Sequence, residues 1–278
     1  MAETAGRRRQ RAAGGFTLVE MVVVIAITGI VAAAVAIFIR NPVQGYLDLD
    51  RRARLTDIAD TALRRIARDV RPALPNSVRT TDGDQTLEFL ATRTGGRYRA
   101  APKADGTGDV LDFSGADTGF DIIGPAVTFA DGDRIVVYNL GPNVSGANAY
   151  SGDNITAYTG AAGAQTHVTI ASFQFPLASP ANRFHVVEGP VSYVCDLPNA
   201  TLWRYWGYPI QSAQPGAAAL AGLPGVQSAR LATQVTGCVF RYVEGVTERS
   251  GLLEMQLTLA EGGETVTLYH TVHVNNVP

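Results

Sequence analysis

Gly14 and Gly15 form a small-residue site directly before a long apolar stretch, and Glu20 lies inside that stretch. Cleavage after Gly15 would expose a new α-amino group on Phe16. Glu20 lies about one helical turn beyond Phe16, so its carboxylate could neutralise that amine in its own chain or in a neighbouring chain. A pair between chains would fix the register of one subunit against the next, a use for which buried ionic groups are best attested.

Glu20 also separates this interpretation from two simpler ones. A secretory signal peptide would carry its small-residue cleavage site after the apolar region, whereas here the Gly14-Gly15 site precedes it. An unprocessed membrane anchor would have no use for a carboxylate in its first turns, because a charge at mid-bilayer costs about 2.5 kcal/mol or more on insertion scales. A helix that is processed after Gly15 does have such a use.

The segments around this site read as a basic leader and a membrane helix. Residues 1–15 hold arginines at positions 7, 8, 9 and 11, and the apolar run that follows ends at Arg40. As a helix, the residues from Phe16 to Ile39 would span about 36 Å, enough for a bilayer core with some tilt. The positive-inside rule keeps the leader in the cytoplasm and places the chain beyond Arg40 outside. We therefore expect a cleaved leader over 1–15 and a transmembrane and assembly helix over 16–40.

Residues 41–75 are predicted to form an amphipathic helix. Pro42 and Gly45 are the positions at which a bend or a brief interruption is expected. Apolar residues then recur at spacings of three and four up to Val70, and they are Leu55, Ile58, Ala59, Ala62, Ile66 and Val70. Pro72 and Pro75 end the helix. The arginines on the remaining face are either a solvated surface or partners for salt bridges between subunits.

Residues 76–278 have the pattern of a β-rich globular domain. Candidate strands are Thr86–Ala91, Arg134–Leu140, His167–Phe175, Arg183–Val187, Val191–Cys195, Thr201–Tyr205, Cys238–Val243, Leu252–Leu259 and Thr265–Val274. Glycine-rich breaks are expected at 94–96 and 261–263, and long loops at 141–165, with room for one short strand, and at 211–227. The predicted fold class is α+β, with a long N-terminal helix packed on a large, mainly antiparallel β domain.

Cys195 and Cys238 are the two cysteines of the chain. In an exported protein such a pair predicts one disulfide. Closing a loop of about 43 residues would stabilise the fold by roughly 4 kcal/mol in the chain-entropy model. Two buried free thiols are the alternative.

Other residues that could carry chemistry have simpler explanations. His270 and His273 fall on opposite faces of a strand, which is a poor arrangement for a metal. Asp82-Gly83-Asp84 and Asp131-Gly132-Asp133 could be calcium loops or tight turns, and tight turns are favoured. The aromatic cluster is expected to pack in the core rather than to form a binding platform, and it comprises Trp203, Tyr205, Trp206 and Tyr208.

The sequence carries no signature of an enzyme. It contains no G-x-S-x-G, no P-loop, no H-E-x-x-H and no C-x-x-C. We therefore predict no catalytic residues, no cofactor and no metal. The net charge of -2 gives no indication of nucleic-acid binding.

The segment Gly15-Phe16-Thr17-Leu18-Val19-Glu20 resembles the prepilin cleavage and methylation motif of type IV pilins and type II secretion pseudopilins. The resemblance implies that a membrane aspartyl peptidase cuts after Gly15 and N-methylates Phe16, and that Glu20 aids assembly. The implied partners are this prepilin peptidase/methyltransferase, other pilin-like subunits and the bacterial inner membrane. The β domain would then be periplasmic until the subunit enters a pilus or pseudopilus.

Residues 183–196, 202–208 and 268–278 are similar to the O-type minor prepilin-like proteins of the mannose-sensitive haemagglutinin (MSHA) pilus. The broader resemblance is to J-type minor pseudopilins, which start or cap a filament. Two features depart from the major pilins, namely a long leader and an apolar run without proline. A minor pseudopilin of a type II secretion system and a glycan-binding adhesin at a filament tip remain alternatives.

Overall fold

The computed structural model describes residues 15–244 and 250–278, with side chains for all of these except residues 39–43. Of the leader expected over 1–15, only Gly15 lies within the described residues. The chain divides into two compact units, Met1–Asp50 and Arg51–Pro278.

Helix α1 spans Leu18–Val70. The expectation of an interruption at Pro42 and Gly45 is wrong, because the helix runs through both positions without a break. A proline inside a helix removes one hydrogen-bond donor and crowds a single carbonyl, and the turns on either side of Pro42 retain their helical conformation. The helix ends at Val70, as the prolines at 72 and 75 predict.

Within the second unit, α1 buries the face that its sequence spacing predicts. Leu55, Ala59, Ile66 and Val70 are completely buried. They pack against strands of two different sheets. The arginines on the rest of this helix remain largely exposed, for example Arg68.

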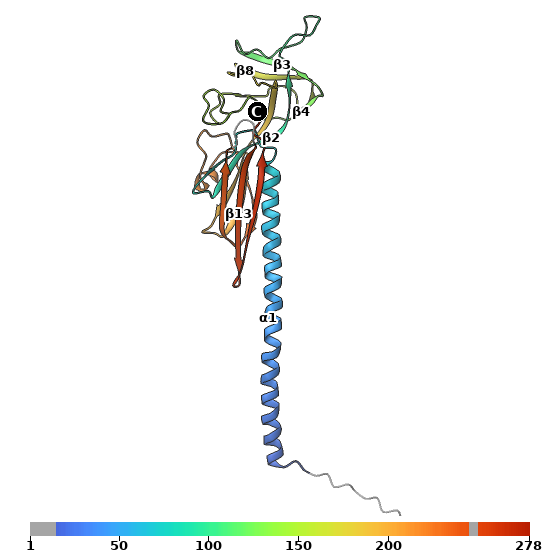
Figure 1. Cartoon of the computed structure of the whole chain (residues 1–278), viewed down its shortest axis with the longest axis vertical. Coiled ribbons are helices and arrows are strands. Elements are labelled where there is room, and N and C mark those ends of the chain that lie inside the picture. The colour runs from blue at the N-terminus through green and yellow to red at the C-terminus, as the bar shows by residue number, and fades with distance from the viewer. Residues whose placement is uncertain (1–14, 245–249) are drawn as a thin grey trace, which may run out of the picture. The chain divides into compact units, whose positions relative to one another are not determined.

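The second unit is built almost entirely from antiparallel sheets (Figure 1). The largest sheet has nine strands: six follow the order β11-β10-β9-β2-β3-β8, and β1, β5 and β6 pair with strands of this row or with each other. A second sheet has three strands in the order β12-β13-β14. In a third, β4 pairs with β7. The strands are β1 Arg79–Thr81, β2 Thr86–Tyr98, β3 Asp117–Ile123, β4 Val127–Phe129, β5 Arg134–Val137, β6 Ile155–Ala157, β7 Gly163–Gln165, β8 His167–Phe173, β9 Arg183–Asp196, β10 Thr201–Trp206, β11 Gln227–Thr233, β12 Val235–Val243, β13 Gly251–Glu261 and β14 Glu264–Val274.

The described residues form four buried apolar clusters, and the two largest are the main cores. The larger core joins residues 55–70 of α1 to β2, β9 and β10 on one side and to β12–β14 on the other. A second core surrounds Phe120 and Phe184, whose ring centroids are 5.3 Å apart. The predicted α+β class, with a helix followed by a large antiparallel β domain, is confirmed.

Several strand boundaries differ from the sequence prediction. The break expected at 94–96 is wrong, because Gly95 and Gly96 lie inside β2. They pair with β9 at such close range that a Cβ on Gly95 would lie 2.7 Å from the carbonyl oxygen of Phe184. The glycines therefore permit a close approach of two strands rather than end one. Likewise, the two strands expected over 183–195 are the single strand β9.

The expected loops contain short elements. Strands β6 and β7 lie in or at the end of the segment 141–165, and the four-residue helix α2, Ala217–Leu220, lies in 211–227. Strands β1, β3, β4 and β11 were not predicted. The break at 261–263 is confirmed as the turn between β13 and β14, where Gly262 and Gly263 have φ values of 58° and 90°.

Candidate processing and assembly site

The Gly15-Phe16 peptide bond lies outside regular secondary structure, just before α1 begins. Phe16 is 76% exposed, and apart from its chain neighbours nothing lies within 4 Å of a Cβ built on Gly15. A peptidase must bind its substrate as an accessible, non-helical chain. The bond that the sequence predicts to be cut meets this requirement.

Thr17 caps the first turn of α1. Its Oγ1 accepts a hydrogen bond from the backbone N–H of Glu20 at 3.3 Å, and its carbonyl accepts one from Met21 N–H at 3.2 Å. Thr17-Leu18-Val19-Glu20 is therefore a T-x-x-E capping sequence with Thr17 at the N-cap and Glu20 at the third helical position. The motif sets where the helix starts as well as where the chain could be cut.

The Glu20 side chain is exposed, and among the described residues no cation pairs with its carboxylate. The helix macrodipole favours a negative charge in the first turn. Glu20 thus lies on the first turn with its carboxylate accessible to a positively charged partner that the uncut described chain does not supply. The amine that cleavage would create on Phe16 is one such group.

The segment Leu18–Phe38 of α1 is long and apolar enough to cross a membrane. Its 21 residues have a mean hydropathy of 2.9, and none of them is buried. At 1.5 Å per residue it would span about 31 Å, close to the thickness of a bilayer core. Its one interior hydroxyl, that of Thr28, donates to the carbonyl of Val24 at 2.6 Å. This surface needs lipid or other apolar helices to cover it.

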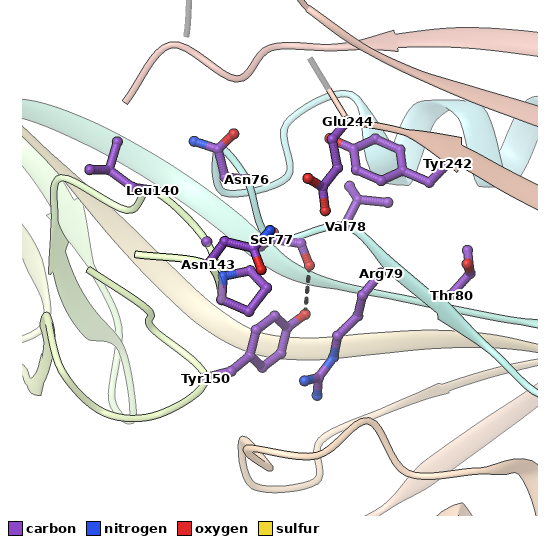
Figure 2. A pocket seen from close by; sticks show the side chains of 12 residues that line it. Asn76, Ser77, Val78, Arg79, Thr80, Leu140, Asn143, Tyr150, Tyr242 and Glu244 are labelled. Carbon is purple, nitrogen blue, oxygen red and sulfur yellow. Dashed lines mark hydrogen bonds between the residues drawn. The ribbon is translucent and has the colours of Figure 1, made fainter. Parts of the chain in front are cut away.

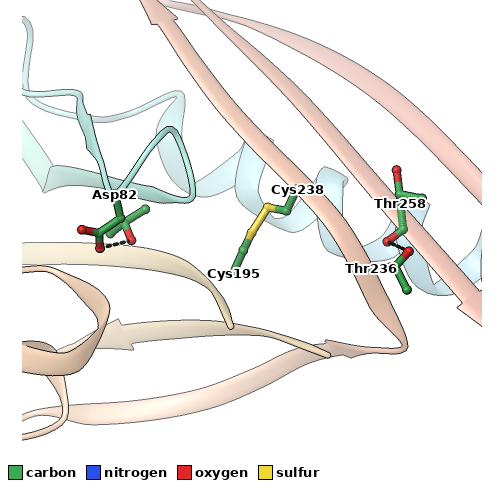
Figure 3. The surroundings of a disulfide bond; sticks show 6 residues. Asp82, Cys195, Thr236, Cys238 and Thr258 are labelled. Carbon is green, nitrogen blue, oxygen red and sulfur yellow. Dashed lines mark hydrogen bonds between the residues drawn. A yellow bond between two sulfur atoms is a disulfide. The ribbon is translucent and has the colours of Figure 1, made fainter. Parts of the chain in front are cut away.

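Cys195 and Cys238 form a disulfide, as predicted (Figure 3). Cys195 lies on β9 and Cys238 on β12, so the bond joins the nine-stranded sheet to the three-stranded sheet. Their Cα atoms are 6.2 Å apart, within the usual range for a disulfide. Both residues are 5% exposed and belong to the main core.

The aromatic cluster at residues 203–208 is largely occupied in packing. Trp206 packs on the main core, and Tyr208 is 3% exposed. Trp203 and Tyr205 are partly buried on the opposite face of β10 from Trp206, with ring centroids 6.3 Å apart. The packing arrangement that the sequence favours over a binding platform is therefore observed.

The two Asp-Gly-Asp segments are turns between strands. Asp82-Gly83-Asp84 connects β1 to β2, and the Asp82 carboxylate accepts hydrogen bonds from Ala217 N–H and the Thr86 hydroxyl. Asp131-Gly132-Asp133 connects β4 to β5, and Asp133 is ion-paired with Arg93 at 3.2 Å. Each carboxylate described here has protein donors around it, as expected for a turn.

His270 and His273 lie on β14 at the odd spacing that separates them onto opposite faces. Accordingly, His270 is half-buried and His273 is exposed. Within the described part of the chain, no group of three or more His, Cys, Asp or Glu residues is placed to hold a metal ion.

An acidic residue on α1, not singled out from the sequence, joins the helix to the large sheet. Asp69 accepts hydrogen bonds from the Tyr193 hydroxyl at 2.7 Å and from Arg204 Nε at 2.9 Å, and it pairs with Arg65 at 3.1 Å. Burial is the main cause that raises the pKa of Tyr193, and the hydrogen bond to Asp69 is the second. Only the regular i, i+4 spacing of Arg65 and Asp69 is visible in the sequence.

Glu88 is a second acidic residue that sequence reasoning missed. It is completely buried on β2 and forms an ion pair with Arg79 at 2.7 Å, while Tyr208 donates to it at 3.0 Å. Burial raises the pKa of Glu88, and the positive charge of Arg79 opposes that shift. In the sequence Glu88 occupies an ordinary position of a strand, so nothing distinguished it.

A cavity of about 300 Å³ lies beside this pair, lined by residues 76–80, 140–143, Tyr150, Tyr242 and Glu244 (Figure 2). The Tyr150 hydroxyl donates to the carbonyl of Ser77 at 2.8 Å. Arg79 is fully engaged, because its guanidinium also donates to two backbone carbonyls and lies 3.5 Å from the centre of the Tyr150 ring. The guanidinium group of Arg79 at the cavity wall is therefore fully occupied by contacts within the β domain.

His185 makes the stability of the β domain sensitive to acid. Burial, with a smaller effect of Arg183, lowers the pKa of His185 from 6.5 to about 4. Its Nε2 atom is buried without a hydrogen-bond partner among the described residues. The folded state thus keeps the imidazole neutral, while the unfolded chain takes up a proton below its ordinary pKa. The contribution of the neutral His185 imidazole to the free energy of unfolding is fully present above pH 6.5. This contribution is lost as the pH falls towards about 4.

We expect the free energy of unfolding to fall by about 2 kcal/mol from this group alone between about pH 7.5 and pH 5. His185→Gln should lose that share of the pH dependence, and the exposed control His273→Gln should keep it. Urea unfolding of the whole chain in non-ionic detergent, followed by the fluorescence of Trp203 and Trp206, measures the difference. The same pH dependence in wild type and His185→Gln would contradict the assignment.

Comparison with known proteins agrees with the N-terminal site. Residues 10–36 match the family model described as the prokaryotic N-terminal methylation motif. No curated protein and no solved structure matches the chain. The matched segment contains the accessible Gly15-Phe16 bond, the Thr17 cap, Glu20 and most of the apolar surface of α1. The motif supports a type IV pilin-like protein, and the apolar helix that carries it fits a membrane anchor.

Proposed function

We propose that the chain is a minor pilin-like subunit of an MSHA-like type IV pilus. Prepilin peptidase cuts after Gly15 and methylates Phe16, and the subunit then joins sister subunits through residues 16–40. The observation that carries the proposal is the accessible Gly15-Phe16 bond directly before an exposed apolar helix. On the first turn of that helix, the carboxylate of Glu20 has no ionic partner among the described residues.

The proposed organisation has four parts. Residues 1–15 are the leader, 16–40 the transmembrane and assembly helix, 41–75 the amphipathic helix, and 76–278 the periplasmic β domain. An internal disulfide suits an oxidising compartment such as the periplasm. The role is structural, since the helix supplies the packing surface and assembly requires no catalytic residue of this chain.

The alternative is a minor pseudopilin of a type II secretion system, because the same motif serves both filaments. A glycan-binding adhesin is less favoured, since Trp206 and Tyr208 of the aromatic cluster are engaged in packing. Copurification from the native host separates the first two, because the subunit should be recovered with pilus or with secretion components.

Mass spectrometry of the N-terminus tests the processing step. Protein purified from host membranes should begin with N-methyl-Phe16. Gly15→Val should remain uncut and keep the leader arginines, because a branched side chain at the scissile residue hinders the peptidase. The matched control is Gly29→Ala, which should be cut normally.

Nothing lies within 4 Å of a Cβ built on Gly15 or Gly29, so neither change disturbs packing within the described chain. A difference in cleavage between the two variants therefore reports on the peptidase. A native chain that keeps Arg7 to Arg11, or one that lacks the whole apolar segment, would rule the proposal out.

A further inference from the structure

Strand β14 has a long unpaired edge. It pairs with β13 along its whole length, from Glu264 opposite Glu261 to Val274 opposite Gly251, with no register shift. In the part of the chain that the structure describes, no strand pairs with its other edge. Edge strands are usually protected by Lys, Pro or a bulge, and β14 contains none of these. Its free backbone donors and acceptors are suited to pairing with another strand.

A groove of about 660 Å³ lies between β14 and α1 within the second unit. His270 lines the groove on β14, and Arg64 and Arg68 line it on α1. Arg71, which directly follows the last residue of α1, lines it as well. In Figure 1 the strands that follow residue 235 lie beside the part of α1 that ends at Val70. A helix and a free strand edge that face each other across a groove are the geometry in which extended peptides add to a sheet.

The groove is positively charged. Arg64 is neutralised by Asp60 at 2.7 Å. Arg68 and Arg71 are exposed, and neither forms an ion pair with another described residue. Asp60 is the one acidic residue in the lining, so two guanidinium groups remain available to an incoming chain.

The spacing of these arginines matches an extended partner. Arg71 directly follows α1, and its N–H donates to the carbonyl of Ala67 at 3.3 Å, as in a continued helical turn. Residues three apart on a helix have Cβ atoms about 5–6 Å apart. Side chains at alternate positions of a strand share a face and lie roughly 6.5–7 Å apart along it. Carboxylates at alternate positions of a strand added to β14 could therefore reach Arg68 and Arg71 together, and Arg–carboxylate pairs are among the stronger charged contacts.

We propose that this groove binds an extended acidic segment of another protein, which adds as a strand to β14 and pairs its carboxylates with Arg68 and Arg71. The inference does not depend on cleavage at Gly15 or on filament assembly, since the groove belongs to the β domain and its part of α1.

Three labelled peptides test the proposal on the whole chain in non-ionic detergent. The first alternates Glu and Val over nine residues, the second replaces each Glu with Lys, and the third keeps the Glu residues but replaces the Val residues with Pro. Fluorescence anisotropy should detect binding of the first peptide alone. The Lys peptide has the wrong charge, and the Pro peptide lacks the N–H groups that pair with a strand edge.

Arg68→Gln combined with Arg71→Gln should weaken binding of the acidic peptide about fivefold to tenfold, as expected for the loss of two exposed ion pairs. Arg230→Gln combined with Arg241→Gln removes the same charge from exposed positions on β11 and β12 and should leave binding unchanged. Added salt should weaken binding, since exposed charges are screened.

Hydrogen exchange locates the bound peptide. The acidic peptide should slow exchange of amides in β14 and leave those of β12 unchanged. Equal binding of the acidic and Pro peptides, or protection elsewhere in the chain, would overturn the added-strand proposal. Protection of β14 that grows with protein concentration in the absence of peptide would also overturn it, because the occupant would then be a second copy of this chain.

Discussion

Glu20→Gln is expected to leave the chain cut and methylated but to reduce its content in assembled filaments about tenfold or more. The exposed Glu20 carboxylate has no partner among the described residues, and the proposed partner is the α-amino group of Phe16 on a neighbouring subunit. Glutamine keeps the size of the side chain and the backbone N–H that donates to Thr17. It removes only the charge, and an unneutralised charge among apolar helices costs about 2.5 kcal/mol or more.

Immunoblots of sheared filaments and of membranes measure this effect in a host that carries the variant as its single copy. The mass spectrum must show N-methyl-Phe16 in the variant, so that failed assembly is not confused with failed processing. Glu254→Gln, at an exposed position on β13, is the matched control and should assemble normally. Wild-type filament content in Glu20→Gln would show that the Glu20 charge has no role in assembly.

Removal of the disulfide is expected to cause the largest loss of stability. Cys195 and Cys238 close a loop with a sequence separation of 43 between the two sheets of the main core. Cys195→Ala combined with Cys238→Ala should lower the free energy of unfolding by about 4 kcal/mol. For a domain of this size that corresponds to a fall of about 10 °C in the melting temperature.

Thermal unfolding followed by tryptophan fluorescence measures the loss, since both tryptophans lie on β10, in the sheet to which Cys195 belongs. Reductant provides the internal control. It should lower the melting temperature of wild type towards that of the double variant and should leave the double variant unchanged. If the variant and the oxidised wild type melt together, the disulfide does not hold the two sheets in the way proposed.

Local sequence patterns predicted the structure correctly wherever residues close together in the chain determine it. The apolar run after Phe16 indicates a helix by length and composition, and spacings of three and four identify the buried face that includes Leu55 and Ile66. The alternation in residues 265–274 similarly predicts β14. The motif around Gly15 and Glu20 needs no tertiary information, because it is a run of consecutive residues that the sequence shows directly.

Strands that depend on distant partners could not be found in this way. Residues 117–123 form β3 because they pair with β2 and β8, although the Asp and Gly residues at 117, 119 and 121 disfavour a strand. Gly95 and Gly96 suggest a break until the close approach of Phe184 is known. In both places the contact across strands outweighs the local preference.

The sequence alone determined the N-terminal methylation motif, the long apolar helix, the buried face of the amphipathic helix and the cysteine pair, because each is a property of residue type and spacing along the chain. Only the tertiary structure decided that Glu88 and Asp69 are held by partners more than a hundred residues away, for example through Tyr208 and Tyr193. It also decided that Arg68 and Arg71 line one groove with His270 of β14. Charges acquire these partners when distant segments fold together, and the spacing of residues along the chain does not carry that information.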